Sequence, residues 1–354
     1  MASSAGGVHV RPAAQRASSL GCRSDWRFGC PGSSRAALSV FSISEALDGQ
    51  RLLAALCRDG AVLLRPAASE RVASKAAAAY KACSHFFAQP LSQKALHGAG
   101  SDVGQLHGYM SYLDDDDGSE CFEVKLHHDP RFIWPGGGLR ERTESILSLL
   151  LHFGRLALDA LVSALHLDAS HVASLLDLCQ PAAAEAAAAN GRLDLAGASH
   201  TALRIWKYTH GRPGGWHCDN TLLTLAPAGT TVGLECRSPS DGTSYRPEEW
   251  MQPDDVLVFA GDALSYLAAG AVPALMHRVE PRGRARLSAP CFLRARRGAL
   301  LVPPQDARLP PLCVAVLEHN ADNVRSQWPW KLPGAPLAAY YSGQVWHPTE
   351  TAGL

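Results

Sequence analysis

The sequence carries no excess of charge of either sign. Lys and Arg together number 33 and Asp and Glu together number 33 in 354 residues, so the formal net charge at pH 7 is +0. Proteins that bind nucleic acid or an anionic membrane surface usually carry a basic excess that attracts phosphate groups. The balanced charge therefore favours a small-molecule substrate over nucleic acid or a membrane as the partner.

The chain also lacks closely paired cysteines and an uninterrupted apolar run of membrane length. Its ten cysteines form no C-x-x-C pair, and several lie inside apolar runs, as at Leu56-Cys57 and Cys291-Phe292. That pattern is typical of reduced, buried thiols in an intracellular protein. The longest apolar stretch, residues 146–167, is interrupted by His, Arg and Asp. Its apolar residues follow helical spacing, which predicts an amphipathic core helix instead of a membrane span.

A hydrophobic fraction of 47% supplies ample material for a core, and the pattern of the chain changes near residue 200. Earlier runs have helical spacing, whereas later apolar or β-branched runs are short and separated by Gly, Pro, Asp and Ser. The predicted helices cover residues 45–57, 69–87, 140–167, 170–179, 182–189 and 312–318, with Ser42 or Ser44 capping the first and Gly60 ending it. The predicted strands cover 203–208, 222–226, 232–236, 256–260, 264–267, 275–279 and 286–294, after a short strand at 61–64.

Such a series of short strands predicts a mainly β core of jelly-roll type. We therefore expect a helix-rich N-terminal region at residues 37–200, the β core at 201–300 and a C-terminal extension at 301–354. The segment 98–138 is expected to be rich in loops. Its acidic run at 114–117 is more typical of a solvated loop than of a calcium site.

Residues 1–36 contain five Arg, no Lys and a single acidic residue, Asp25, among many Ser, Ala and Gly. This composition is that of an organellar transit peptide, and equally that of a disordered tail. The expected location is inside the cell, either in the cytoplasm or in a chloroplast or mitochondrion.

The candidate metal ligands are His217, Asp219 and His277. Residues two apart on a strand share a face, so His217 and Asp219 can converge on one ion while Cys218 points away. His277, framed by apolar residues of a distant strand, can complete the site. Two imidazoles and one carboxylate are the facial triad of non-haem Fe(II) oxygenases. The same ligands also bind Zn²⁺, but no Glu is placed beside a ligand as a general base for hydrolysis.

The candidate anion-binding residues are Arg286 and Ser288, which share one face of a strand that follows the turn at 281–283. Arg presents a planar fork that matches a carboxylate, and the neighbouring hydroxyl adds a donor. An inward-facing Arg286 needs an anionic partner, because burying an unpaired charge is costly. A dicarboxylate co-substrate would supply that partner. The alternative is a solvated Arg286 on an outward face.

These residues resemble the 2-oxoglutarate and Fe(II)-dependent dioxygenases, in their isopenicillin-N-synthase-like branch, over roughly residues 43–297. The most specific part is the stretch 216–225, which holds His-x-Asp followed by Leu-Thr. Further matching motifs are Gly233-Leu234, Gly261-Asp262, His277-Arg278-Val279 and Arg286-Leu287-Ser288. The resemblance implies a double-stranded β-helix with His217, Asp219 and His277 as iron ligands and Arg286 and Ser288 on the 2-oxoglutarate carboxylate. It also makes Tyr208 a further donor to that carboxylate, although the residues around Tyr208 depart from the family pattern.

The activity implied by the resemblance is hydroxylation or desaturation of a small organic substrate with O2, while 2-oxoglutarate becomes succinate and CO2. Substrate contacts are expected near Gly108-Tyr109 and Glu123. One alternative is a facial-triad oxidase that takes its electrons from ascorbate or from its own substrate and uses no 2-oxoglutarate. Another is a non-catalytic binding protein that keeps the fold.

Overall fold

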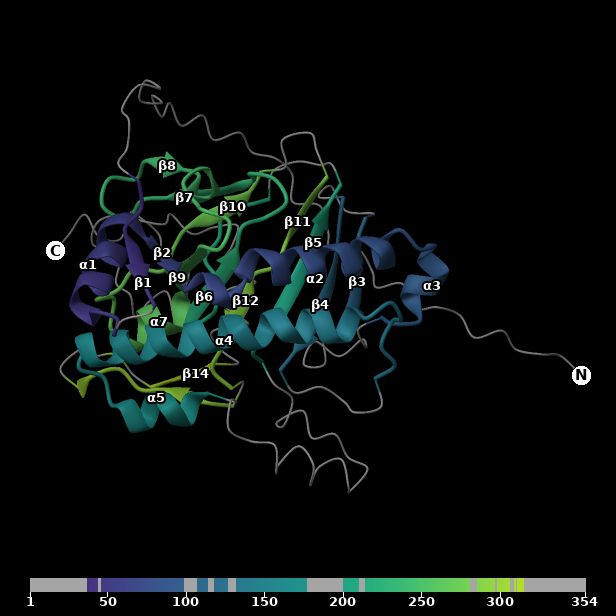
Figure 1. Ribbon diagram of the computed structural model, residues 1–354. Coiled ribbons are helices and arrows are strands. Elements are labelled where there is room, and N and C mark those ends of the chain that lie inside the picture. Colours follow the sequence, from purple (N-terminus) through teal and green to yellow (C-terminus); the bar gives the residue numbers. More distant parts are fainter. Residues whose placement is uncertain are drawn as a thin grey trace, which may run out of the picture. The chain divides into compact units, whose positions relative to one another are not determined.

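The computed structural model describes residues 37–43, 46–98, 107–113, 118–126, 132–176, 200–209, 214–280, 285–296, 298–305, 309 and 311–314. All of them belong to one compact unit that begins at Ala37 (Figure 1). The helices are α1 (Gly49–Asp59), α2 (Val72–Phe87), α3 (Leu91–Ala95), α4 (Leu139–Ala164), α5 (Ala169–Leu175) and α7 (Asp262–Leu267), with 3-10 helices η1 (Ala68–Glu70) and η4 (Pro247–Glu249). The strands are β1 (Val40–Ser42), β2 (Ala61–Arg65), β3 (Gly108–Tyr112), β4 (Ser119–Lys125), β5 (Ala202–Tyr208), β6 (Leu223–Pro227), β7 (Leu234–Arg237), β8 (Ser244–Tyr245), β9 (Val256–Ala260), β10 (His277–Val279), β11 (Arg286–Ser288), β12 (Cys291–Leu293), β13 (Leu300–Leu301) and β14 (Leu312–Cys313).

The described strands form one large sheet, one small sheet and one separate strand pair. The large sheet has the order β1-β2-β9-β6-β12-β5-β4-β3, with β11 also paired to β5. The small sheet has the order β10-β7-β8, and β13 pairs with β14. This sheet-rich core with flanking helices confirms the predicted double-stranded β-helix, or jelly roll. β1 to β4 come from the region predicted to be helix-rich, so that region supplies one edge strand pair at each end of the large sheet. The proposed boundaries at residues 36, 200 and 300 stay predictions.

The large sheet is covered on both faces, and alternation along its strands shows how. In β2, Val62 and Leu64 belong to the main hydrophobic core, whereas Leu63 belongs to a second cluster. β9 repeats the pattern, with Val258 in the first cluster and Phe259 in the second. Successive side chains of a strand point to opposite faces, so one face meets the helices and the other meets the small sheet.

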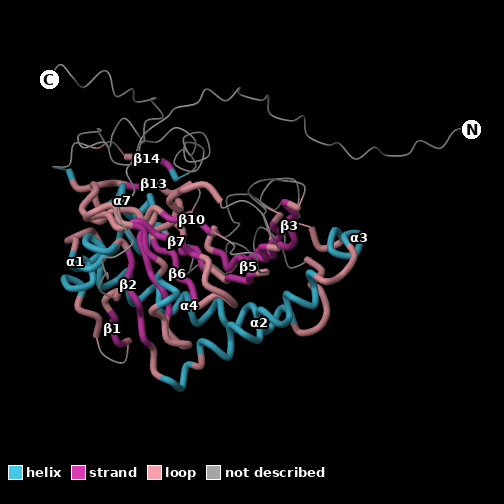
Figure 2. The backbone as a smooth tube through the Cα atoms, turned by 90° about the horizontal axis from the view of Figure 1, so that it is seen from above, coloured by secondary structure: helices cyan, strands magenta, loops and turns pink. Residues whose placement is uncertain are grey.

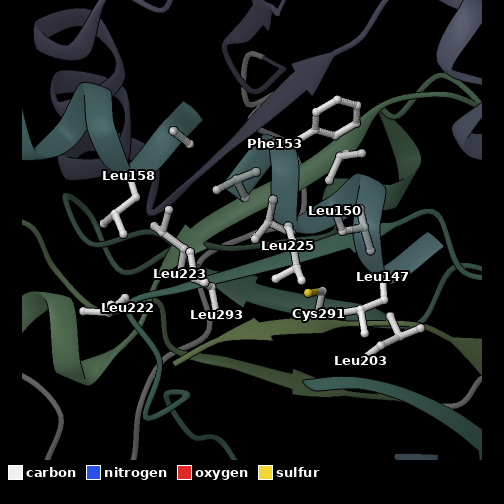
Figure 3. Close-up of a cluster of buried hydrophobic side chains, with 14 of the residues drawn as sticks. Leu147, Leu150, Phe153, Leu158, Leu203, Leu222, Leu223, Leu225, Cys291 and Leu293 are labelled. Carbon is white, nitrogen blue, oxygen red and sulfur yellow. The ribbon is translucent and has the colours of Figure 1, made fainter. Parts of the chain in front are cut away.

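Helix α4 is the main cover of the helical face. It packs beside α2, and both helices run along one side of the strands (Figures 1 and 2). Figure 3 shows part of this core, in which Leu147, Leu150, Phe153 and Leu158 of α4 belong to one buried cluster with Leu203, Leu222, Leu223, Leu225, Cys291 and Leu293. By length and composition alone α4 could cross a membrane. Its apolar face lies in the core, as predicted for residues 146–167.

Of the two predicted ends of helix α1, the C-terminal end is confirmed and the N-terminal cap is wrong. Gly60 ends α1 as predicted, and its φ of 83° is a left-handed conformation that favours glycine. The cap at the other end is Asp48, whose carboxylate accepts a hydrogen bond from the Arg51 N–H at 3.1 Å. The prediction of Ser42 or Ser44 was wrong because α1 starts several residues later than its apolar pattern suggested, directly after Asp48.

Three element predictions were wrong. Residues 264–267 lie in helix α7 and not in a strand. Every residue of α7 is buried, and so short a run has no period that distinguishes a helix from a strand. Residues 312–313 form strand β14 instead of starting a helix. The segment predicted to be rich in loops contains β3 and β4, and the charged residues of β4 concealed a strand that is buried throughout.

Other expectations fall outside the described residues. These are the transit peptide or tail at 1–36, the acidic run at 114–117 and the helix at 182–189.

A buried ion cluster explains how β4 tolerates its charged residues. The Lys94 ammonium donates to Glu120 Oε2 at 2.5 Å, the Lys207 ammonium donates to Oε1 at 2.8 Å, and the Tyr109 hydroxyl donates to Oε2 at 2.9 Å. Burial by itself disfavours the charged carboxylate, but the hydrogen bonds from Lys207, Lys94 and Tyr109 outweigh it and lower the pKa of Glu120 below its ordinary 4.5.

We expect Glu120 to contribute stability that is lost in acid. Because its pKa is lowered on folding, the contribution is complete above pH 4.5 and disappears as the pH falls through the lower pKa of the folded state. Glu120→Gln should lower the free energy of unfolding at pH 7 by about 3–5 kcal/mol and weaken its dependence on pH below 4.5. Urea unfolding at a series of pH values measures both. Glu144→Gln, on the exposed face of α4, is the control. An unchanged acid profile in Glu120→Gln would contradict this assignment.

Candidate functional site

The predicted ligands His217, Asp219 and His277 lie together. Their ligand atoms are all within 4.8 Å of one another. Asp219 Oδ1 lies 3.9 Å from His217 Nε2 and 3.8 Å from His277 Nε2. His217 and His277 exchange backbone hydrogen bonds, the N–H of each donating to the carbonyl of the other, so the main chain holds the two rings side by side. Cys218 points away from them and packs with Ala274 and Met276, as expected from strand alternation.

Both imidazoles are oriented by backbone carbonyls. His217 Nδ1 lies 2.9 Å from the Gly215 carbonyl oxygen, and His277 Nδ1 lies 3.1 Å from the Leu275 carbonyl oxygen. A carbonyl can only accept, so each Nδ1 carries the hydrogen and each Nε2 keeps its lone pair for an ion. This tautomer is the one that a metal-binding histidine needs.

Asp219 is held in its ionised form. Burial by itself raises the pKa of this carboxyl, but His277, His217 and a hydrogen bond from Thr224 together lower it. The Thr224 hydroxyl donates to Asp219 Oδ2 at 2.7 Å, which leaves Oδ1 facing the imidazoles. Two imidazoles and one carboxylate with open positions beside them are a ligand set that fits Fe(II).

A cavity of about 450 Å³ opens beside this group of ligands. Two stripes of alternating residues contribute to its wall. On β5 these are Arg204, Trp206 and Tyr208, and along β11 and β12 they are Arg286, Ser288, Pro290, Phe292 and Arg294. The residues between the second set, Leu287, Ala289, Cys291 and Leu293, lie in the hydrophobic core. Arg286 therefore faces inward and is only 3% exposed, so the alternative of a solvated Arg286 was wrong.

The three predicted anion-binding residues lie next to one another on paired strands. Arg286 is opposite Tyr208 in the register of β11 and β5, and Ser288 is opposite Trp206. Burial raises the pKa of Tyr208, and its hydrogen bond with Ser288 opposes that effect. Arg286, Ser288 and Tyr208 thus present a guanidinium and two hydroxyls at one end of the cavity.

Arg286 already has an anionic partner within the protein, which the sequence did not reveal. Its Nη2 donates to Glu248 Oε1 at 2.6 Å. Glu248 also accepts the N–H groups of Gly229, Gly233 and Leu234 at 3.2, 2.7 and 2.9 Å. The predicted need of an inward Arg286 for an anionic partner is therefore met, at least in part, by Glu248. Arg286 Nε and Nη1 are still buried without a hydrogen-bond partner among the described residues, and both are donors suited to a carboxylate.

Two glycines make room for this arginine. A Cβ atom at Gly233 would lie 2.6 Å from Arg286 Cδ, and one at Gly229 would lie 2.8 Å from Arg286 Nη1. These distances are too short for any other residue, so the main chain approaches the guanidinium closely on this side. The Gly233-Leu234 motif has a physical role here, because it supplies both the space and two of the N–H groups that hold Glu248.

Sequence reasoning missed the positive group at the other end of the cavity. Arg204 donates to Glu123 through Nε at 2.8 Å and also through Nη2. Glu123 was expected near the substrate, and its part is to hold a residue of the cavity wall. Tyr109 was expected there too, but it bonds to Glu120 on the opposite face of β4. The place of Arg294 in the cavity wall was predictable, because an even number of residues separates it from Arg286 along the predicted strand. The contact of Glu248 was not predictable, because Glu248 lies in a 3-10 helix with no periodic pattern.

Comparisons with known proteins agree with this geometry. Residues 201–295 match the model of the 2OG-Fe(II) oxygenase superfamily, a range that includes all six predicted site residues. No curated protein matches the chain. Among solved structures, the chain is similar to a Caulobacter crescentus protein assigned to the 2OG-Fe(II) oxygenase family, with 21% identity and a TM-score of 0.62 over 82% of this chain and 100% of that one.

Two further structures have the same fold. A full-length Neurospora crassa protein in complex with alpha-KG has 15% identity and a TM-score of 0.59, over 82% of this chain and 96% of that one. The dioxygenase for auxin oxidation 1 of Arabidopsis thaliana, in a complex with 2-oxoglutarate, has 20% identity and a TM-score of 0.56, over 76% of this chain and 97% of that one.

Proposed function

Since residues 201–295 form a domain of the 2OG-Fe(II) oxygenase superfamily, we propose that the protein hydroxylates or desaturates a small organic substrate. As a member of that superfamily it is an enzyme that works with Fe(II), 2-oxoglutarate and O2, and the proposed reaction releases succinate and CO2. We place it in the isopenicillin-N-synthase-like branch. One observation carries the proposal. The oriented group of His217, Asp219 and His277 shares a cavity with Arg286, two of whose donors have no partner in the part of the chain that the structure describes.

In this proposal His217 Nε2, His277 Nε2 and the Asp219 carboxylate hold the iron. Bound iron supplies the activation of O2, a reaction that amino-acid side chains do not perform. The carbonyls of Gly215 and Leu275 accept from Nδ1 of the two rings and so direct Nε2 of each ring toward the metal site. It also fixes the carboxylate through Thr224. The three ligands occupy one side of the ion and leave the cavity side for the substrates.

The other end of 2-oxoglutarate binds to Arg286, Ser288 and Tyr208. The free Nε–H and Nη1–H of Arg286 and the two hydroxyls are donors to its distal carboxylate. Glu248 keeps the guanidinium in place through the remaining nitrogen, and apolar wall residues such as Leu257 and Phe259 exclude water from the cavity.

Coupled product analysis tests the function. The full chain, purified and supplied with Fe(II), 2-oxoglutarate and O2, should form succinate in step with the 2-oxoglutarate consumed, even as uncoupled turnover without a prime substrate. Chelation of the metal should stop this reaction and added Fe(II) should restore it. Oxidation of a substrate with no 2-oxoglutarate consumed would instead identify an oxidase that draws electrons from ascorbate or from its substrate. Zinc in place of iron would contradict the proposal entirely.

We expect Arg286→Lys to raise the KM for 2-oxoglutarate by about tenfold or more, since a charge-assisted hydrogen bond contributes roughly 1.5–3 kcal/mol. Lys keeps the positive charge beside Glu248 but loses the planar fork. Steady-state kinetics of succinate formation at varied 2-oxoglutarate measures the effect, with iron content as the control. An unchanged KM would remove Arg286 from the co-substrate site.

A further inference from the structure

The end of the cavity away from Arg286 combines guanidinium groups with aromatic rings. Arg204 Cζ lies 5.4 Å from the ring centroids of both Trp206 and Phe292, and Arg294 Cζ lies 4.7 Å from that of Phe292. All four side chains line the cavity. The proposed co-substrate occupies the Arg286 end, so this second group has no part in holding it.

Arg204 and Arg294 have different hydrogen-bond partners. Arg204 forms an ion pair with Glu123, a carboxylate that is 1% exposed. Arg294 donates through Nη1 to the neutral carbonyl of His200 at 3.4 Å. Burial works against ionisation of Glu123, yet Arg204, Arg294 and Lys125 together lower its pKa, so three cationic side chains surround this one carboxylate. The group is therefore positively charged, and Arg204 is the member that is hydrogen-bonded to Glu123.

A second aromatic wall has the same character. Trp216 lines the cavity next to His217, and Arg237 Cζ and Arg278 Cζ lie 4.3 and 4.8 Å from its ring centroid. Guanidinium groups placed over rings attract anions while keeping the rings available to a flat molecule. Arg278 is also paired with Glu235, its Nε donating to Oε2 at 2.7 Å. The Trp216 wall thus offers an aromatic face to a planar ligand, and the arginines that line this end of the cavity belong to the wall of Trp206 and Phe292.

We propose that the prime substrate is a small ring-bearing carboxylate, with its ring between the aromatic walls of Trp206, Phe292 and Trp216 and its carboxylate on Arg294. This inference rests on the proposed function, because it assigns the substrate end of the same cavity. Arg294 is the specificity-determining residue, and Arg204 is a positioning residue that Glu123 holds against the same rings. Arg294 lines the same cavity as His217, Asp219 and His277, so a substrate bound at Arg294 shares that cavity with the iron ligands.

Anaerobic calorimetry on the holoenzyme tests this assignment without turnover. The full chain is first loaded with Fe(II) and 2-oxoglutarate under nitrogen, and both binding steps are recorded. Phenylacetate, cinnamate and indole-3-acetate are then titrated in parallel with their neutral amides. We expect at least one acid to bind about tenfold or more tightly than its amide, the size of one charge-assisted hydrogen bond. Equal affinities of acids and amides, or no binding of any acid, would overturn the proposal.

Substitutions assign the effect to Arg294. Arg294→Gln should abolish the preference for the acid over the amide, and Arg294→Lys should keep part of it. Arg140→Gln removes a guanidinium from the exposed face of α4 and should keep all of it. Equal weakening of acid and amide in Arg294→Gln would show a packing role and overturn the assignment. If Arg294→Gln does not fold, the ratio of acid to amide affinity in Arg294→Lys and in the unaltered protein still tests the assignment. Loss of iron or 2-oxoglutarate binding in the first step would instead contradict the proposed function.

Discussion

Asp219→Ala is expected to yield a folded protein that no longer retains iron and forms no succinate. Asp219 is the single carboxylate of the ligand group, and the two imidazoles that remain provide neither charge neutralisation nor a third donor. Metal analysis of the purified variant after incubation with Fe(II), together with an assay for succinate, measures the result. One iron per chain in Asp219→Ala would exclude this residue as a ligand.

Two neighbouring variants make that test specific. Cys218→Ala changes the adjacent residue, whose side chain packs with Ala274 and Met276, and it should retain iron. Thr224→Val removes the hydroxyl that donates to Asp219 Oδ2. Because loss of such an orienting contact typically weakens metal binding by about 10- to 100-fold, iron should still bind, but less tightly. The three variants should therefore rank as Cys218→Ala, Thr224→Val and Asp219→Ala in order of decreasing affinity.

Glu248→Leu is expected to destabilise the folded protein by about 3–5 kcal/mol, because it leaves a buried guanidinium unpaired. Side chains of the pair are 3% and 7% exposed, so water cannot replace the missing carboxylate. The N–H groups of Gly229, Gly233 and Leu234 lose their acceptor at the same time. Urea unfolding of iron-free protein, with and without the substitution, gives the difference in free energy.

A double-mutant cycle separates the ion pair from the rest. Arg286→Leu alone should also destabilise, since it leaves Glu248 buried without its guanidinium. The double variant Arg286→Leu, Glu248→Leu should lose less stability than the sum of the single losses, because it buries no unpaired charge. Strict additivity would mean that the two side chains do not stabilise each other. Arg65 and Asp255 form an ion pair in which Arg65 is 40% exposed, and the same cycle there should give a much smaller coupling.

The sequence was most informative where chemistry depends on spacing along one strand. Arg286 and Ser288 are two residues apart on β11, and the period of a strand places them on one face. His217 and Asp219 have the same spacing and also converge, although they lie outside the strands and His217 forms an isolated bridge with His277. Contacts between distant segments were not predictable in this way. Glu248 reaches Arg286 from a separate 3-10 helix, and no local pattern connects the two residues.

Secondary structure failed for a related reason. β4 carries Glu120, Glu123 and Lys125, and three charged residues in seven are typical of an exposed segment, although every residue of β4 is buried. It is a strand because residues far away in the sequence neutralise those charges: Lys94 and Lys207 on one face and Arg204 on the other. Only the folded sheet brings these partners together, whereas a hydrophobic pattern such as that of β9 can be read locally.

The alternation along β5 and along residues 286–294 restricts how this enzyme can evolve. Odd-numbered residues such as Leu203 and Leu287 pack in the core, and even-numbered ones such as Arg204 and Arg294 line the cavity. Deletion of one residue would exchange the two sets and expose the core while burying arginines in it. New substrate preferences can therefore arise through point substitutions at every second position, while changes of length are confined to the connecting loops. A mutant library restricted to the even positions of both stripes would sample specificity while sparing the fold.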